Sequence, residues 1–114
     1  MIILAFSAAL TLAGPFAAQD PLPSYDEAVR CAGLTQAASE LEGGESGEGR
    51  SLYDAALYWS LTALQMAQAA ARPIPATEAD QTRARIRGVR ELSAGDAAAR
   101  TELQRCRTRA PRLG

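Results

Sequence analysis

The sequence contains no histidine, no lysine and no asparagine, and aromatic residues make up only 5% of its 114 residues. The absence of histidine excludes Ser-His-Asp and Cys-His catalysis and every metal site that uses an imidazole ligand. The absence of lysine excludes Schiff-base chemistry and the Walker A phosphate loop. We therefore assign no catalytic residue, no cofactor-binding residue and no metal ligand, and we expect a protein that is not an enzyme.

A strong excess of either charge is also missing, because the formal net charge is -1. No basic surplus therefore indicates a nucleic-acid partner, and we expect none. The 47% content of hydrophobic residues is typical of a folded protein rather than a disordered one. A chain of this length is expected to form a single domain.

The first 19 residues carry no charged side chain, and an apolar run extends over residues 2–13 before Gly14-Pro15. A membrane span needs about 20 apolar residues, so this shorter run is more typical of a secretory signal. We expect a signal peptide over residues 1–18 and a helical domain over 19–114, which places the protein in the periplasm or outside the cell. A core helix of the domain and an uncleaved membrane anchor remain as alternatives.

The remaining sequence predicts an all-α fold, because alanine is abundant, valine and isoleucine are sparse, and no alternating pattern indicates a strand. Ser24 and Glu27 fit a capping box, and Asp96 fits the N-cap of the last helix. Four glycines within residues 43–49 predict a flexible loop. Caps and apolar periodicity together predict a compact bundle of about four helices, at approximately 24–42, 51–71, 77–93 and 96–109.

The second predicted helix is apolar around most of its circumference. One face carries a set that includes Leu52, Trp59 and Met66, and a second face carries Tyr53, Leu57, Leu61 and Leu64. A helix that is hydrophobic on several sides is expected in the middle of a bundle or against a partner. We therefore expect this helix to be the central one.

Cys31 and Cys106 are the two cysteines of the chain. Each lies in the middle of the apolar stripe of its predicted helix, so both sulfur atoms are expected to face the core. Two cysteines in a small exported domain favour a structural disulfide. Unpaired core thiols are the alternative.

The charges are segregated along the chain. Residues 19–80 have a balance of −7, and residues 81–114 have a balance of +6. One interpretation is that the basic helices neutralise the acidic half. The alternative is an anion-binding face that holds an acidic partner, a lipid headgroup or a polysaccharide, formed by Arg83, Arg87, Arg90, Arg100 and Arg107.

Tyr53, Tyr58 and Trp59 cluster in the second predicted helix, where they either pack in the core or form an aromatic groove. The first-turn carboxylates are explained by helix capping and by the helix dipole. The function predicted best is non-catalytic: an exported accessory factor that binds another protein of the cell envelope. Two alternatives are a binder of anionic lipid or polysaccharide and a minor hydrolase that uses carboxylates. Two routes to membrane contact also stay open: binding of anionic headgroups and an uncleaved N-terminal segment.

Replacing Cys31 or Cys106 by serine is expected to lower the melting temperature by many degrees. A bridge between residues 75 positions apart contributes about 4.5 kcal/mol in the chain-entropy model. Thermal unfolding of each variant beside the parent measures the effect, and an unchanged melting temperature would contradict it.

Overall fold

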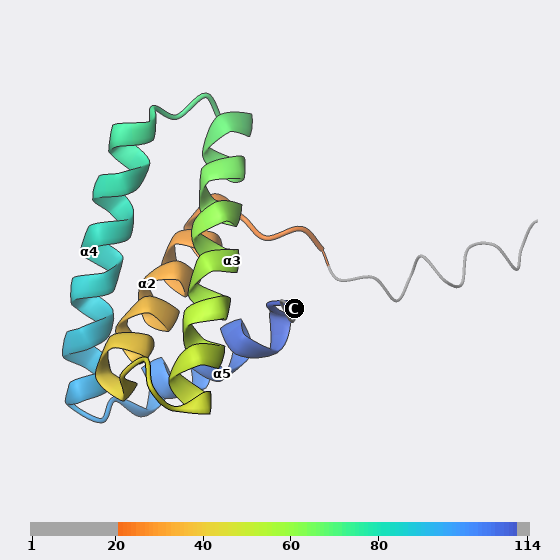
Figure 1. Cartoon of the computed structure of the whole chain (residues 1–114). Helices are drawn as coiled ribbons and strands as arrows, with labels where there is room; N and C mark the ends of the chain where they lie inside the picture. The colour runs from red at the N-terminus through yellow and green to blue at the C-terminus, as the bar shows by residue number, and fades with distance from the viewer. Residues whose placement is uncertain (1–20, 112–114) are drawn as a thin grey trace, which may run out of the picture.

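The computed structural model describes residues 21–111, and this part of the chain is all-helical, as predicted (Figure 1). Its four helices are α2 (Tyr25–Glu42), α3 (Gly47–Ala69), α4 (Ile74–Ser93) and α5 (Ala97–Arg109). They form a bundle with a shared hydrophobic core. The expected signal peptide over 1–18 lies outside the described residues, and none of the described helices is long and apolar enough to cross a membrane.

Helix α2 begins where the capping box was predicted. The Glu27 backbone N–H donates to Ser24 Oγ at 3.0 Å, which satisfies one of the free amides of the first turn. The Glu27 side chain does not turn back to complete the box. It forms an ion pair with Arg109 of α5 instead.

Helix α3 begins at Gly47, four residues before the predicted start at Ser51. Ser46 is the N-cap, and its Oγ accepts a hydrogen bond from the Gly49 N–H at 2.9 Å. A Cβ atom at Gly49 would lie 1.7 Å from the carbonyl oxygen of Gly43, so the close approach of the preceding turn requires glycine there. The glycines therefore shape the start of α3, and the flexible loop predicted over 43–49 is shorter than expected.

Helix α4 also begins earlier than the predicted residue 77. It starts at Ile74, and Pro75 occupies its first turn. Proline is compatible with this position because the first amides of a helix have no carbonyl partner within it. Thr77, expected near the start of the helix, is fully buried. Helix α5 follows the prediction, because Asp96 Oδ1 accepts a hydrogen bond from the Ala99 N–H at 2.9 Å.

The central position belongs to α2 and not to the helix that the sequence favoured. Helix α2 lies between α3 and α4, and α5 crosses one end of the bundle (Figure 1). The face of α3 that carries Leu52 and Trp59 is buried in the shared hydrophobic core. Its second apolar face is exposed at Tyr53, Leu57 and Leu61. Helix α3 is therefore a side helix with one face in the core.

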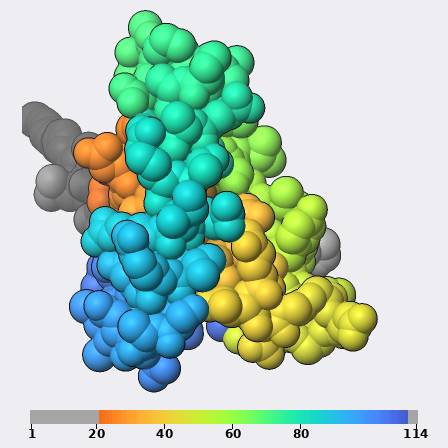
Figure 2. Space-filling view, turned by 90° about the vertical axis from the view of Figure 1, so that its left-hand side faces the viewer, coloured from red at the N-terminus to blue at the C-terminus, as the bar shows by residue number. Residues whose placement is uncertain are grey.

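The contact between α2 and α4 depends on small residues. A Cβ atom on Gly33 would lie 2.5 Å from the backbone carbon of Ala84, and one on Gly88 would lie 3.1 Å from the Gly33 carbonyl oxygen. The two backbones therefore approach more closely than ordinary side chains allow. Figure 2 shows the outer surface of α4, which covers this side of α2.

The variant Gly33→Ala is expected to lower the free energy of unfolding by up to about 2 kcal/mol, because overpacking usually costs about 1–3 kcal/mol and the helix preference of alanine offsets roughly 1 kcal/mol of that. The added methyl group must push α2 and α4 apart, and this cost exceeds the roughly 1 kcal/mol that alanine gains over glycine in a helix. Urea denaturation measures the change. The matched control is Gly47→Ala in α3, where the nearest atom lies 3.9 Å from the added Cβ. A Gly33→Ala variant as stable as the parent would show that the helices can separate freely.

Candidate functional site

The two cysteines form the predicted disulfide. The bridge joins Cys31 of α2 to Cys106 of α5, and the two Cα atoms are 5.5 Å apart. Both residues are buried in the core cluster. The helical phase that placed them on inward faces is confirmed, and the bond links the first described helix to the last.

Trp59 lies beside this bridge and is only 1% exposed. Its indole Nε1–H donates to the carbonyl oxygen of Cys106 at 3.0 Å, which satisfies the one polar group of the ring. Tyr58 packs edge-on against the indole, with ring centres 5.0 Å apart. Two of the three predicted aromatic residues therefore pack at the core, where Trp59 joins α3 to α5.

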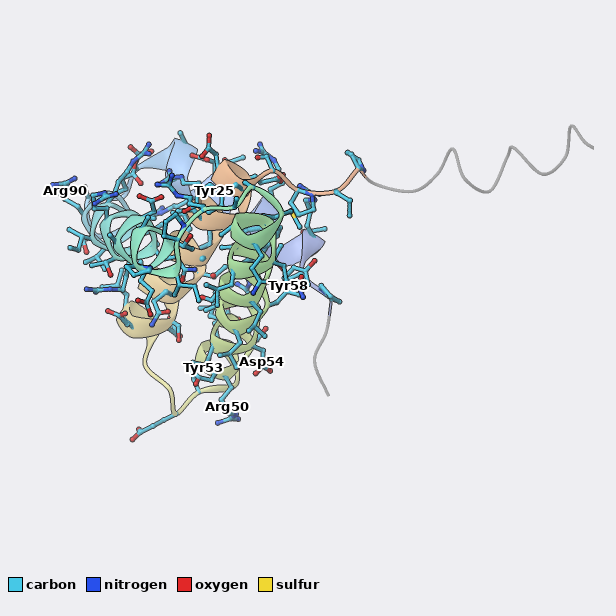
Figure 3. The ribbon with its side chains drawn as sticks, turned by 90° about the horizontal axis from the view of Figure 1, so that it is seen from above. Tyr25, Arg50, Tyr53, Asp54, Tyr58 and Arg90 are labelled. Carbon is cyan, nitrogen blue, oxygen red and sulfur yellow. A yellow bond between two sulfur atoms is a disulfide. The ribbon has the colours of Figure 1, made fainter. Side chains whose placement is uncertain are left out.

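Tyr53 does not join these two rings. It lies six residues before Trp59, so a helix places the two side chains on different faces. Tyr53 and Tyr58 also leave α3 on different sides (Figure 3). The structure therefore does not bring the three predicted aromatic residues together into one groove.

Tyr53 instead belongs to an exposed apolar row, which we call the α3 stripe: Tyr53, Leu57 and Leu61. These side chains are 53%, 42% and 60% exposed. They repeat every four residues, so they follow one another along a single face of the helix. The sequence pattern predicted this apolar face and indicated that it lies either in the middle of the bundle or against a partner.

The five arginines of the predicted anion-binding face are distributed over two helices. Three of them form ion pairs: Arg83 with Asp80, Arg87 with Glu91, and Arg107 with Glu48. Within the described part of the chain, Arg90 and Arg100 are exposed and form no ion pair. Much of the charge segregation along the sequence is thus neutralised within the fold.

An ionic cluster around Arg30 was not predicted. The Arg30 guanidinium of α2 donates to Glu91 of α4 at 2.7 Å and forms two hydrogen bonds to Glu102 of α5, at 2.8 and 3.2 Å. These bonds stabilise the charged forms, so they lower the pKa of both carboxyls and raise the pKa of Arg30. A signal was present in the sequence, because Arg30 is one of three arginines in the acidic half.

A second polar cluster connects the start of α2 to the loop between α3 and α4. The Tyr25 hydroxyl donates to Asp80 Oδ2 at 2.6 Å and lies 3.3 Å from the hydroxyl of buried Thr77. Arg72 donates to both the Tyr25 oxygen and Asp80, at 3.0 and 2.6 Å. The hydrogen bond from Tyr25, followed by that from Arg72, lowers the pKa of Asp80. Asp80 therefore has a structural role, because Tyr25, Arg72 and Arg83 all contact its carboxylate.

A polar recess of about 320 Å³ lies between α2 and α4. Its lining offers amide, hydroxyl, carboxylate and guanidinium groups: Ala32, Gln36, Glu78, Gln81, Thr82 and Arg85. Arg85 also pairs with Glu40 at 3.1 Å, and Gln81 donates to the Ser60 carbonyl at 3.4 Å. These groups suit hydrogen bonding to a small polar molecule.

Among residues 21–111, no group of three or more histidine, cysteine or acidic side chains could hold a metal ion. Comparison of the chain with protein-family models, with curated proteins and with solved structures finds no match.

The variant Arg30→Gln loses the charged hydrogen bonds to Glu91 and Glu102, so it is expected to lower the free energy of unfolding at neutral pH by about 1–2 kcal/mol. The loss is modest because solvent screens the partly exposed Glu102. A lowered carboxyl pKa contributes stability above the unfolded pKa, and that stability is lost as the pH falls through the folded value. The parent should therefore lose stability as the pH falls below the ordinary glutamate pKa of 4.5, and the variant should lose less over the same range.

Urea titrations at several pH values measure both effects. Arg90→Gln is the matched control, because Arg90 is exposed on α4 and forms no ion pair within the described residues. Parallel pH profiles for the parent and Arg30→Gln would contradict the assigned role of this cluster.

Proposed function

We propose that the protein is exported, to the periplasm or beyond the cell, and acts there as a non-catalytic accessory factor that binds another protein. The disulfide between Cys31 and Cys106 supports the exported location, because such bonds persist in oxidising compartments. The charge-free N-terminal sequence supports it as well.

The observation that carries the binding role is the α3 stripe. Leucine and tyrosine side chains exposed in a continuous row cost free energy in water, and such rows are typical of interaction sites. The polar clusters around Arg30 and Asp80 are engaged in contacts within the protein. Trp59 likewise has its hydrogen-bond partner in Cys106.

The partner that fits the α3 stripe is the apolar face of a helix in another exported protein. Side chains at four-residue spacing are the usual anchors in helix-to-helix recognition. Three side chains cover much less than the roughly 800 Å² that each partner contributes to a standard stable interface. Any stable partner, a second copy included, must therefore also contact surface beside this row.

The anion-binding alternative is less well supported by the geometry. Arg83, Arg87 and Arg107 already contact carboxylates, and the negative charge of these partners would weaken the attraction of an incoming anion. Arg90 and Arg100 remain as exposed cations on two helices. We therefore rank protein binding first.

A photo-crosslinking residue placed at Leu57 or Leu61 in the full chain, expressed in its native host, should capture one and the same protein in the exported fraction. Placement at Gln104, which is exposed on α5, should not capture it. The purified partner should bind Leu57→Glu and Leu61→Glu at least about tenfold more weakly than the parent, a difference of about 1.4 kcal/mol.

The matched control for the added charge is Gln104→Glu, which should bind as the parent does. Equal crosslinking at all three positions would contradict a specific site at the α3 stripe. Recovery of the protein only from the cytosol would contradict the exported location.

A further inference from the structure

Helix α5 is attached to the bundle in a different way from α2 and α3. It buries Ala99, Leu103 and Cys106, whereas α2 and α3 each bury eight residues. Helix α4 buries only Thr77 and Gly88, but its backbone is in close contact with α2 at Gly33. Most of the other described side chains of α5 are exposed or half-buried polar and arginine residues. Apolar burial therefore contributes comparatively little to the attachment of α5 to the other helices.

The polar attachments of α5 are the buried hydrogen bond from Trp59 to the Cys106 carbonyl and three partly exposed ion pairs. Arg107 pairs with Glu48 of α3, Arg109 pairs with Glu27 of α2, and Glu102 pairs with Arg30 of α2. Partly exposed pairs of this kind contribute modestly to stability. The disulfide is the one attachment of α5 that thermal motion cannot break.

The connection to α4 is a short turn, closed by backbone hydrogen bonds from the Gly95 and Asp96 amides to the Leu92 and Glu91 carbonyls. Residues 94–96 separate the two helices, and Gly95 has φ +74°, a conformation that glycine adopts without strain. When α5 leaves the bundle, α4 keeps its contact with α2, and a detached helix of 13 residues loses most of its helical structure in water. Helices α2, α3 and α4 make most of their contacts with one another.

We propose that α5 is a strap latched by the Cys31–Cys106 disulfide, and that reduction by a dithiol releases it while α2, α3 and α4 stay folded. Release uncovers the apolar side chains around Trp59. This inference rests on the disulfide and on the packing of α5, and it does not depend on a partner at the α3 stripe.

Access to the sulfur atoms comes from the end of α5. Cys106 lies in the last turn of this helix, whereas Cys31 lies in the middle of α2. Both residues are buried, so a reductant reaches Cys106 only when the last turn opens. Helix ends open locally at much lower free energy than helix centres.

The chemical step is thiol–disulfide exchange. A thiolate of the dithiol attacks Sγ of Cys106, the bond to Cys31 breaks, and the Cys31 thiolate takes up a proton. The second thiol of the reductant then attacks the mixed disulfide, which releases Cys106 as a thiol. The protein gains two electrons and two protons, and the dithiol becomes a disulfide.

The test uses the oxidised full chain, treated with dithiothreitol and checked by alkylation of both thiols. Trp59 is the single tryptophan and reports on the strap, because it is buried and bonded to Cys106. We expect its emission to shift to longer wavelength. Amide exchange should accelerate by about tenfold or more in residues 97–109 and remain slow in the cores of α2, α3 and α4. Far-UV circular dichroism should lose only the signal of the 13 residues of α5.

The double variant Cys31→Ser with Cys106→Ser is the control, since it should resemble the released form without reductant and should not respond to it. Two results would overturn the proposal. Unchanged Trp59 emission and unchanged protection of 97–109 after complete reduction would mean that the ionic and apolar contacts hold α5 on their own. Loss of protection in all four helices would mean that the bond stabilises the whole domain and releases no separate strap.

Discussion

The close approach of α2 to its neighbours is the constraint on which the other features depend. Helix α2 presents a surface of alanine, glycine and threonine to the core, and Gly33 lets the α4 backbone come within van der Waals contact. Backbones at this distance leave little room between the helices, so few large side chains fit. Trp59 and Leu34 are the two largest fully buried side chains. The core is therefore built mostly from small side chains.

A core of small side chains explains why the fold also uses a disulfide and ion pairs. Small side chains bury little apolar area, and a domain of this size has a modest margin of stability. The disulfide reduces the entropy of the unfolded chain, and Arg30 connects three helices through two carboxylates. Charge segregation along the sequence becomes neutralisation in space, because Arg107 and Arg109 of the basic half contact acids of the other half.

Local signals in the sequence predicted those features that depend on neighbouring residues. Ser24 and Asp96 cap α2 and α5 as expected, and helical phase placed both cysteines inward. The start of α3 was predicted wrongly because a count of glycines does not reveal that one of them, Gly49, is needed for a tight turn. The central helix was predicted wrongly because α3 has the larger number of large apolar side chains. Helix α2 occupies the centre instead, because its small residues let the neighbouring helices approach closely. The Arg30 cluster needs three helices to be placed first, so spacing alone could not define it.

The position of α2 also explains why α3 has an unused apolar face. A helix in the middle of a bundle must bury all its apolar sides, but a side helix buries only one, and Tyr53, Leu57 and Leu61 are left in water. This face and the Trp59 face that α5 covers lie on different sides of α3. A partner on the α3 stripe would therefore contact the same surface whether α5 is latched or released. A ligand with equal affinity for two states does not shift their equilibrium, so occupation of the α3 stripe would leave the latch unaffected.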